Sequence, residues 1–164
     1  MAINDKYTID LEAAARSGKP VLIKVENDLF EALDEDEITG GQLDVEASVK
    51  SAGGIAYSIN YSIDGIVTVP CDRCLDDLSI PVSTSGSIKL YQNEEDSPHD
   101  GESKVIRKGA MAYDPSWDIY EIAEVALPLQ RAHKEGECNP EMMEILKHHH
   151  AENNAEEETE EETN

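Results

Sequence analysis

The chain has little positive charge and few aromatic side chains. Of its 164 residues, 13 are Lys or Arg against 36 Asp or Glu, which gives a net charge of −23 with neutral histidines. Such a surface repels phosphate backbones and excludes a broad basic clamp for nucleic acid. Because aromatic residues make up only 5% of the chain, its core must be built mainly from Ile, Val and Leu.

Long apolar runs and a secretory signal are also missing. No run approaches the roughly 18 apolar residues of a membrane-spanning helix, and Met1–Asp10 lacks a basic segment followed by an apolar one. Three cysteines, two of them close together, suit a reduced compartment better than a disulfide framework. We therefore expect a cytoplasmic protein with no membrane partner.

The sequence contains none of the common catalytic motifs. The G-x-S-x-G, G-x-x-x-x-G-K-[ST], G-x-G-x-x-G and H-E-x-x-H patterns are all absent. The many carboxylates are no evidence of a site in so acidic a chain. We expect no catalytic residues, no small-molecule substrate and no enzymatic activity.

Negative charge is concentrated at the C-terminal end. Seven glutamates and no Lys or Arg occur from Ala151 to Asn164. This segment has too little apolar surface to offset the entropy of ordering it. The sequence therefore predicts a single domain over residues 1–150, followed by a disordered acidic tail over residues 151–164.

The middle of the chain is rich in strand signals. Apolar and polar residues alternate from Leu43 to Val49 and from Ile55 to Ile63, which is typical of half-buried strands. Gly53-Gly54 separates these runs and Asp64-Gly65 separates the second from residues 66–69; both dipeptides favour hairpins. Similar patterns predict strands over residues 7–11, 21–25 and 78–82, the last continuing toward residue 90.

Two helices are expected after these strands. The first carries small and apolar residues at helical spacing, namely Ile119, Ile122, Ala123 and Ala126. The second begins at Asn139-Pro140-Glu141, where a capping residue precedes a first-turn proline and an acid. The fold class is α+β: an antiparallel β-meander or partly closed barrel, with two C-terminal helices packed on it.

Cys71 and Cys74 are separated by two residues, a spacing that lets both sulfurs face one zinc ion. His133 and Cys138 follow in the loop between the two expected helices and would complete a Cys3His ligand set. Two alternatives stay open: metal-free cysteines, and a reactive dithiol or regulatory disulfide. The redox alternative is weakened because the pair follows a β-meander and does not open a helix within a strand–helix–strand unit.

Two blocks of the sequence resemble the YceD (DUF177) family, over roughly residues 5–147. The segment IVTVPCDRCLDDLSI, residues 66–80, resembles the family's strand that runs into C-x-R-C-L. The second block is the acidic and apolar helix that ends at Leu127-Pro128, followed by His133 and Cys138. Their order and spacing are similar to those of a Bacteroides-type member.

The resemblance implies a non-enzymatic role in large ribosomal subunit assembly, supporting 23S rRNA processing or accumulation. At this net charge, RNA contact would need a local patch such as Arg73, Arg131, His133 and Lys134. The expected partner is the large-subunit rRNA precursor or, alternatively, a basic ribosomal protein that this acidic chain would bind like a chaperone. A CxxC thiol-redox protein is the second alternative, and one structural zinc is the only cofactor expected.

Overall fold

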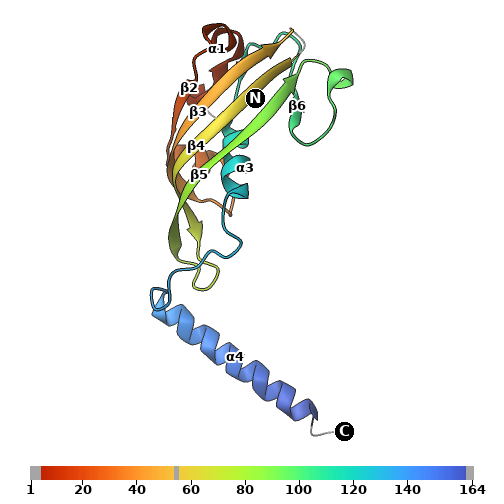
Figure 1. The fold of residues 1–164 in the computed structure, drawn as a ribbon. Helices are drawn as coiled ribbons and strands as arrows, with labels where there is room; N and C mark the ends of the chain where they lie inside the picture. Colours follow the sequence, from red (N-terminus) through yellow and green to blue (C-terminus); the bar gives the residue numbers. More distant parts are fainter. Residues whose placement is uncertain (1–4, 54–55, 162–164) are drawn as a thin grey trace. The chain divides into compact units, whose positions relative to one another are not determined.

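The computed structural model describes residues 5–53 and 56–161 and has an α+β fold, which confirms the predicted class (Figure 1). Its elements in chain order are η1 (Asp5–Tyr7), β1 (Ile9–Asp10), α1 (Leu11–Ser17), β2 (Val21–Val25), α2 (Asn27–Leu33), β3 (Gly40–Ala52), β4 (Ala56–Pro70), β5 (Asp77–Tyr91), η2 (Glu94–Asp96), β6 (Ser103–Val105), β7 (Ala112–Tyr113), α3 (Ser116–Val125) and α4 (Pro140–Glu161).

The chain divides into two compact units. The first, here named the sheet unit, comprises Met1–Val69 and Ser79–Leu127; the second, the C-terminal unit, comprises Pro70–Leu78 and Pro128–Asn164. The predicted single domain over residues 1–150 stays a prediction.

A five-stranded sheet in the order β2-β3-β4-β5-β6 organises the sheet unit. β3 pairs antiparallel with both β2 and β4, so the meander prediction is confirmed there. β6 instead pairs parallel to β5, with Lys89 opposite Ser103. Parallel neighbours usually need a crossover of about a dozen residues, which the polar segment between β5 and β6 nearly provides. The described strands form an open sheet, so the partly closed barrel is wrong.

β4 continues through Asp64-Gly65, where the sequence predicts a hairpin. Gly65 has a φ of +155° and lies opposite Leu43 in the register. A Cβ at Gly65 would lie only 2.2 Å from the carbonyl oxygen of Gln42. Close approach of two backbones therefore requires this glycine, and no turn is involved. The predicted break between β3 and β4 at Gly53 is confirmed, whereas Ile55 lies outside the described residues.

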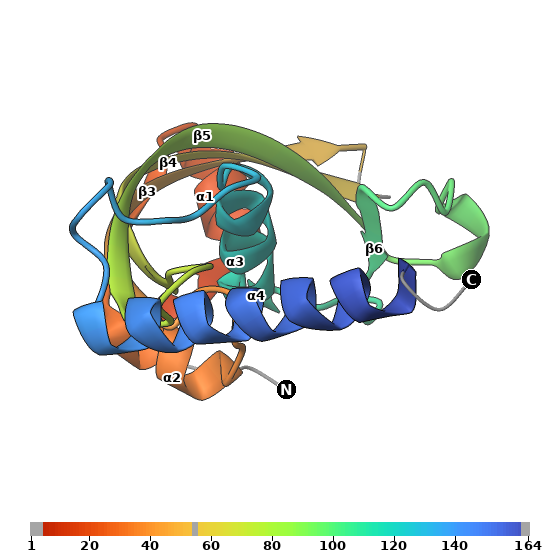
Figure 2. The same ribbon diagram turned by 90° about the horizontal axis from the view of Figure 1, so that it is seen from below.

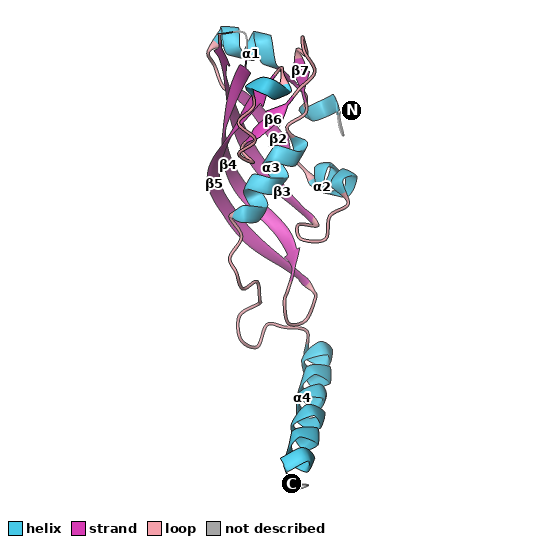
Figure 3. Ribbon diagram, turned by 90° about the vertical axis from the view of Figure 1, so that its right-hand side faces the viewer, coloured by secondary structure: helices cyan, strands magenta, loops and turns pink. Residues whose placement is uncertain are grey.

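The inward face of the sheet carries the core. The predicted alternation is confirmed from Leu43 to Val49 of β3 and from Ile59 to Ile63 of β4, but not at Tyr57, which is half-buried. The buried residues are Leu43, Val45, Ala47, Val49, Ile59, Tyr61 and Ile63. The sheet curves around α3 (Figures 2 and 3). A Cβ at Gly86 of β5 would lie 2.8 Å from Cδ1 of Ile122. The missing side chain at Gly86 thus lets α3 pack directly on the strand.

Two short helices, α1 and α2, are not predicted by the sequence patterns above. Asp10 caps α1 by accepting a 2.9 Å hydrogen bond from the N–H of Ala13, and Gly18 ends this helix at φ +65°. The strand predicted over residues 7–11 is therefore reduced to the two residues of β1. α2 buries Leu29, Phe30 and Leu33, which hold it against the core.

α4 is one continuous helix (Figure 1). Its predicted start is confirmed, because Oδ1 of Asn139 accepts hydrogen bonds from the N–H groups of Glu141 (3.0 Å) and Met142 (3.4 Å). The helix extends to Glu161, so the disordered tail is not confirmed; residues 162–164 lie outside the description. Packing of both helices on the sheet is not confirmed either, because only α3 belongs to the sheet unit. No helix in the described ranges is long and apolar enough to cross a membrane.

Candidate metal centre

Cys71 and Cys74 lie in the tight turn between β4 and β5. The N–H of Leu75 donates to the carbonyl of Cys71, and the N–H of Cys71 donates to the carbonyl of Asp76, both at 2.9 Å. Both cysteines are buried, and all three cysteines of the chain are free thiols. The pair does not open a helix, which disfavours the redox interpretation because redox C-x-x-C motifs gain thiolate stability from a helix N-terminus.

The loop between α3 and α4 is hydrogen-bonded to this turn. The N–H of Arg131 donates to Oδ2 of Asp72, and the N–H of Asp72 donates to the carbonyl of Arg131, both at 2.7 Å. The guanidinium of Arg73 donates to the carbonyl of His133. These bonds within the C-terminal unit bring together two segments about sixty residues apart in sequence, as their ligand pattern predicts.

The four predicted ligand residues place their donor atoms in one cluster. All four atoms lie within 4.8 Å of one another. The Sγ atoms of Cys71 and Cys138 are 3.9 Å apart, and Nδ1 of His133 lies 3.4 Å from Sγ of Cys74 and 4.0 Å from Sγ of Cys138. A tetrahedral zinc ion with Cys and His ligands needs donor separations of about 3.6–3.8 Å. The three separations of 3.4–4.0 Å are close to these values, so the cluster is compatible with a tetrahedral metal site.

The imidazole of His133 is oriented by a backbone acceptor. Its Nε2 lies 3.0 Å from the carbonyl oxygen of Asp77, which can only accept a hydrogen bond. Nε2 of the neutral ring therefore carries the proton, and the lone pair of Nδ1 faces the sulfurs. Histidine ligands of metals are commonly held in this way. No sequence signal identifies Asp77 here, because its contribution is a main-chain oxygen.

The turn also favours the thiolate form of Cys71. Burial alone would raise the pKa of this thiol, but hydrogen bonds from the backbone of Cys74, Arg73 and His133 outweigh burial and lower it to about 6. A hydrogen bond with Cys71 raises the pKa of His133, whereas burial raises the pKa of Cys138. Since thiolates bind metals and thiols do not, the backbone favours the metal-binding form of one candidate ligand.

The three cations predicted to bind a partner have different environments. Arg73 is held by the carbonyl of His133, and Nε of Arg131 lies 3.9 Å from Oδ1 of Asp72. Lys134 is exposed. A hollow of about 580 Å³ beside Arg73 and Cys138 is also lined by Glu135, Glu144 and Lys147, among others. Its opposite charges offset one another, so this hollow is not a strong anion site.

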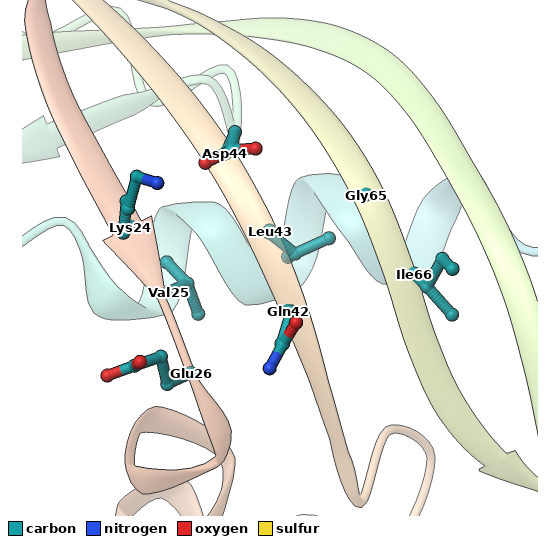
Figure 4. A pocket seen from close by; sticks show the side chains of 8 residues that line it. All are labelled: Lys24, Val25, Glu26, Gln42, Leu43, Asp44, Gly65 and Ile66. Carbon is teal, nitrogen blue, oxygen red and sulfur yellow. The ribbon is translucent and has the colours of Figure 1, made fainter.

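Another hollow, of about 380 Å³, lies over the sheet at Gly65 (Figure 4). Its charged residues are Lys24, Glu26 and Asp44, and Lys24 is the cross-strand partner of Asp44 in the register. No Cys, His or Ser lines it. Opposite charges on neighbouring strands stabilise a sheet, so the pair Lys24 and Asp44 has a structural role here.

A buried carboxylate in the sheet unit has a role that the sequence does not reveal. Oδ2 of Asp118 accepts from the hydroxyls of Tyr61 (2.7 Å) and Tyr113 (2.8 Å), and Oδ1 accepts from Nζ of Lys104 (2.6 Å). The N–H of Ser116, the first residue of α3, donates instead to Oδ1 of Asp114 at 2.9 Å. Asp118 thus connects α3 to β4, β6 and β7.

The family model for the large ribosomal RNA subunit accumulation protein YceD matches residues 59–164. The match contains all four clustered residues. No curated protein matches the chain, and no solved structure matches it.

Proposed function

The chain belongs to the YceD family, and from this we propose that it is a non-enzymatic factor that supports 23S rRNA processing or accumulation during large-subunit assembly in the cytoplasm. The observation that carries the proposal is the match over residues 59–164, described as a large ribosomal RNA subunit accumulation protein. The Cys–His cluster lies entirely within the match, so it belongs to the part of the chain that the family shares.

We propose further that Cys71, Cys74, His133 and Cys138 hold one structural zinc ion. Bound zinc would cross-link the β4–β5 turn to the loop before α4 and add its binding energy to folding. Four protein ligands fill a tetrahedral site and leave no position for a water or substrate. The cluster therefore supports a scaffolding role and offers no position for catalysis.

The functional test is depletion of the protein in its own cells. We expect the ratio of 23S to 16S rRNA and the amount of free 50S subunits to fall, and re-expression of the chain to restore both. Unchanged 23S rRNA and 50S levels after complete depletion would contradict the proposal. As a control, an unrelated acidic protein is expressed in the depleted cells, and it should not restore 23S rRNA or 50S subunits.

The net charge of −23 favours a second candidate, a chaperone-like partner for a basic ribosomal protein. Sedimentation with purified basic ribosomal proteins, using the full chain and a chain lacking residues 151–164, tests this candidate across a salt series. Binding that weakens with salt and with removal of the acidic segment would support it. Absence of binding at low salt would exclude it.

A further inference from the structure

One segment of this acidic chain is locally basic. The eleven residues from Ser103 to Tyr113 contain Lys104, Arg107 and Lys108 and no Asp or Glu. Arg107 and Lys108 are also the only adjacent pair of cations in the sequence. Against a net charge of −23, a local reversal of sign marks a surface where a negatively charged partner is not repelled.

The two adjacent cations lie on a turn that is held at both ends. The N–H of Ile106 donates to the carbonyl of Tyr91 at 2.8 Å, and the N–H of Leu11 donates to the carbonyl of Met111 at 2.7 Å. Between these anchors, the N–H of Ala110 donates to the carbonyl of Arg107 at 2.9 Å, with Gly109 at φ +78°. This fixed turn would lose little backbone entropy on binding a partner.

Of the three cations in this segment, Lys104 is bound within the chain, whereas Arg107 and Lys108 are not bound in its described part. Nζ of Lys104 is bound to Asp118 at 2.6 Å and lies 3.5 Å from Glu121. Arg107 and Lys108 are exposed, and within residues 5–53 and 56–161 their side chains form no ion pair or hydrogen bond. They differ in this respect from Arg73 and Arg131, which are bound within the C-terminal unit.

A hollow of about 700 Å³ lies beside the turn, lined by residues 106–114 together with Asp5 and Thr8. The hydroxyl of Thr8 is buried and has no hydrogen-bond partner in the described part of the chain. Asp114 also lines the hollow, but its Oδ1 accepts from the N–H and the hydroxyl of Ser116. Acids and cations both line the hollow, so their charges offset one another there. An anion would therefore be attracted to the exposed side of the turn, where Arg107 and Lys108 face solvent.

We propose that the Arg107–Lys108 turn is where the chain contacts the phosphate backbone of single-stranded RNA. This inference rests on the proposed role in rRNA accumulation and gives that role a contact surface in the sheet unit. A guanidinium binds a phosphate through two parallel hydrogen bonds, and a lysine ammonium binds it as a point charge. The surrounding negative surface then limits the contact to a few phosphates.

The test measures binding of a labelled polyuridylate RNA to the full chain by fluorescence anisotropy over a salt series. The variant is Arg107→Gln/Lys108→Gln. The matched control is Lys24→Gln/Lys50→Gln, which removes two exposed cations of the sheet unit and changes the net charge equally. Two phosphate contacts on a single strand contribute about −1.4 to the slope of log affinity against log salt. We expect the Arg107→Gln/Lys108→Gln slope to be shallower by about this amount and the control slope to match the wild type.

Three results would overturn the inference: no RNA binding by the wild-type chain at low salt, equal weakening by both double variants, or equal salt-dependent binding to polyglutamate. The cell experiment separates this inference from the proposed function. If depletion leaves 23S rRNA unchanged, the proposed function fails and the binding slopes still decide the contact. If depletion lowers 23S rRNA and the Arg107→Gln/Lys108→Gln chain binds RNA and restores 23S rRNA fully, the contact alone is refuted.

Discussion

Nδ1 of His133 lies 3.4 Å from Sγ of Cys74, although 59 residues separate them in sequence. The opposite ring nitrogen, Nε2, lies 3.0 Å from the carbonyl oxygen of Asp77. One nitrogen is therefore committed to the backbone, which leaves the other for a metal ion. The proposed role of His133 as a metal ligand can therefore be tested by replacing this one side chain.

Replacing His133 with Ala should weaken zinc binding by at least about 100-fold, because even loss of a group that only orients a ligand commonly costs 10–100-fold. Competition with a fluorescent zinc chelator measures this change. The matched control is His99→Ala, a histidine in the η2–β6 connection outside the cluster. Equal zinc affinities of the two variants would remove His133 from the ligand set.

Asp118→Asn should lower the free energy of unfolding by about 2 kcal/mol, because it removes the charge that accepts hydrogen bonds from Lys104 and the two tyrosines, while Lys104 keeps Glu121 at 3.5 Å. The single tryptophan, Trp117, is the neighbouring residue, so urea unfolding followed by its fluorescence reports on this part of α3. The control, Asp44→Asn on the sheet surface, should change stability by at most about 1 kcal/mol, the contribution of its cross-strand pair with Lys24. Similar midpoints for both variants would show that the buried network adds little.

Stability should fall above pH 10 because of the phenols bound to Asp118. Burial and the neighbouring carboxylate raise the pKa of Tyr61 and Tyr113 above the ordinary value of 10.0. A raised pKa contributes stability that is complete below the pKa of the unfolded phenol and is lost as pH rises beyond it. Urea unfolding at a series of alkaline pH values measures the decline.

Tyr61→Phe should make this alkaline decline shallower, because one of the two phenols no longer titrates. Tyr91→Phe is the control, since Tyr91 is half-buried at the end of β5 and is not bonded to Asp118 in the described hydrogen bonds. A decline of equal steepness in wild type and Tyr61→Phe would show that these phenols do not set the alkaline limit.

Local patterns predicted the sheet well where each residue has one wet and one buried face. The alternation from Leu43 to Val49 and from Ile59 to Ile63 appears as buried positions of β3 and β4. Predictions were wrong where the same residue type serves two different structural purposes. Asp64-Gly65 favours a hairpin in the sequence, whereas the glycine is required by the close approach of the backbone of β3. Asp10 and Gly18, the caps of α1, were present in the sequence, but the apolar alternation around Ile9 favoured a strand.

The clustering of Cys71, Cys74, His133 and Cys138 could be predicted because their spacing in the sequence is that of zinc-binding segments. The groups that support it could not, because they are main-chain atoms: the carbonyl of Asp77 and the turn amides that favour the Cys71 thiolate. The contacts of Arg73 and Arg131 also arise only where the β4–β5 turn meets the loop before α4. Sequence spacing indicated that these arginines lie near the ligands, but only the structure shows that they bind within the unit.

The most direct test of the proposed metal centre is metal analysis of the full chain purified without chelators. We expect about one zinc ion per chain, and Cys74→Ser purified in the same way should contain far less zinc and melt at a lower temperature, because bound metal adds to folding free energy. A folded wild-type chain with clearly less than one zinc ion, and a melting temperature that added zinc does not raise, would contradict the proposal.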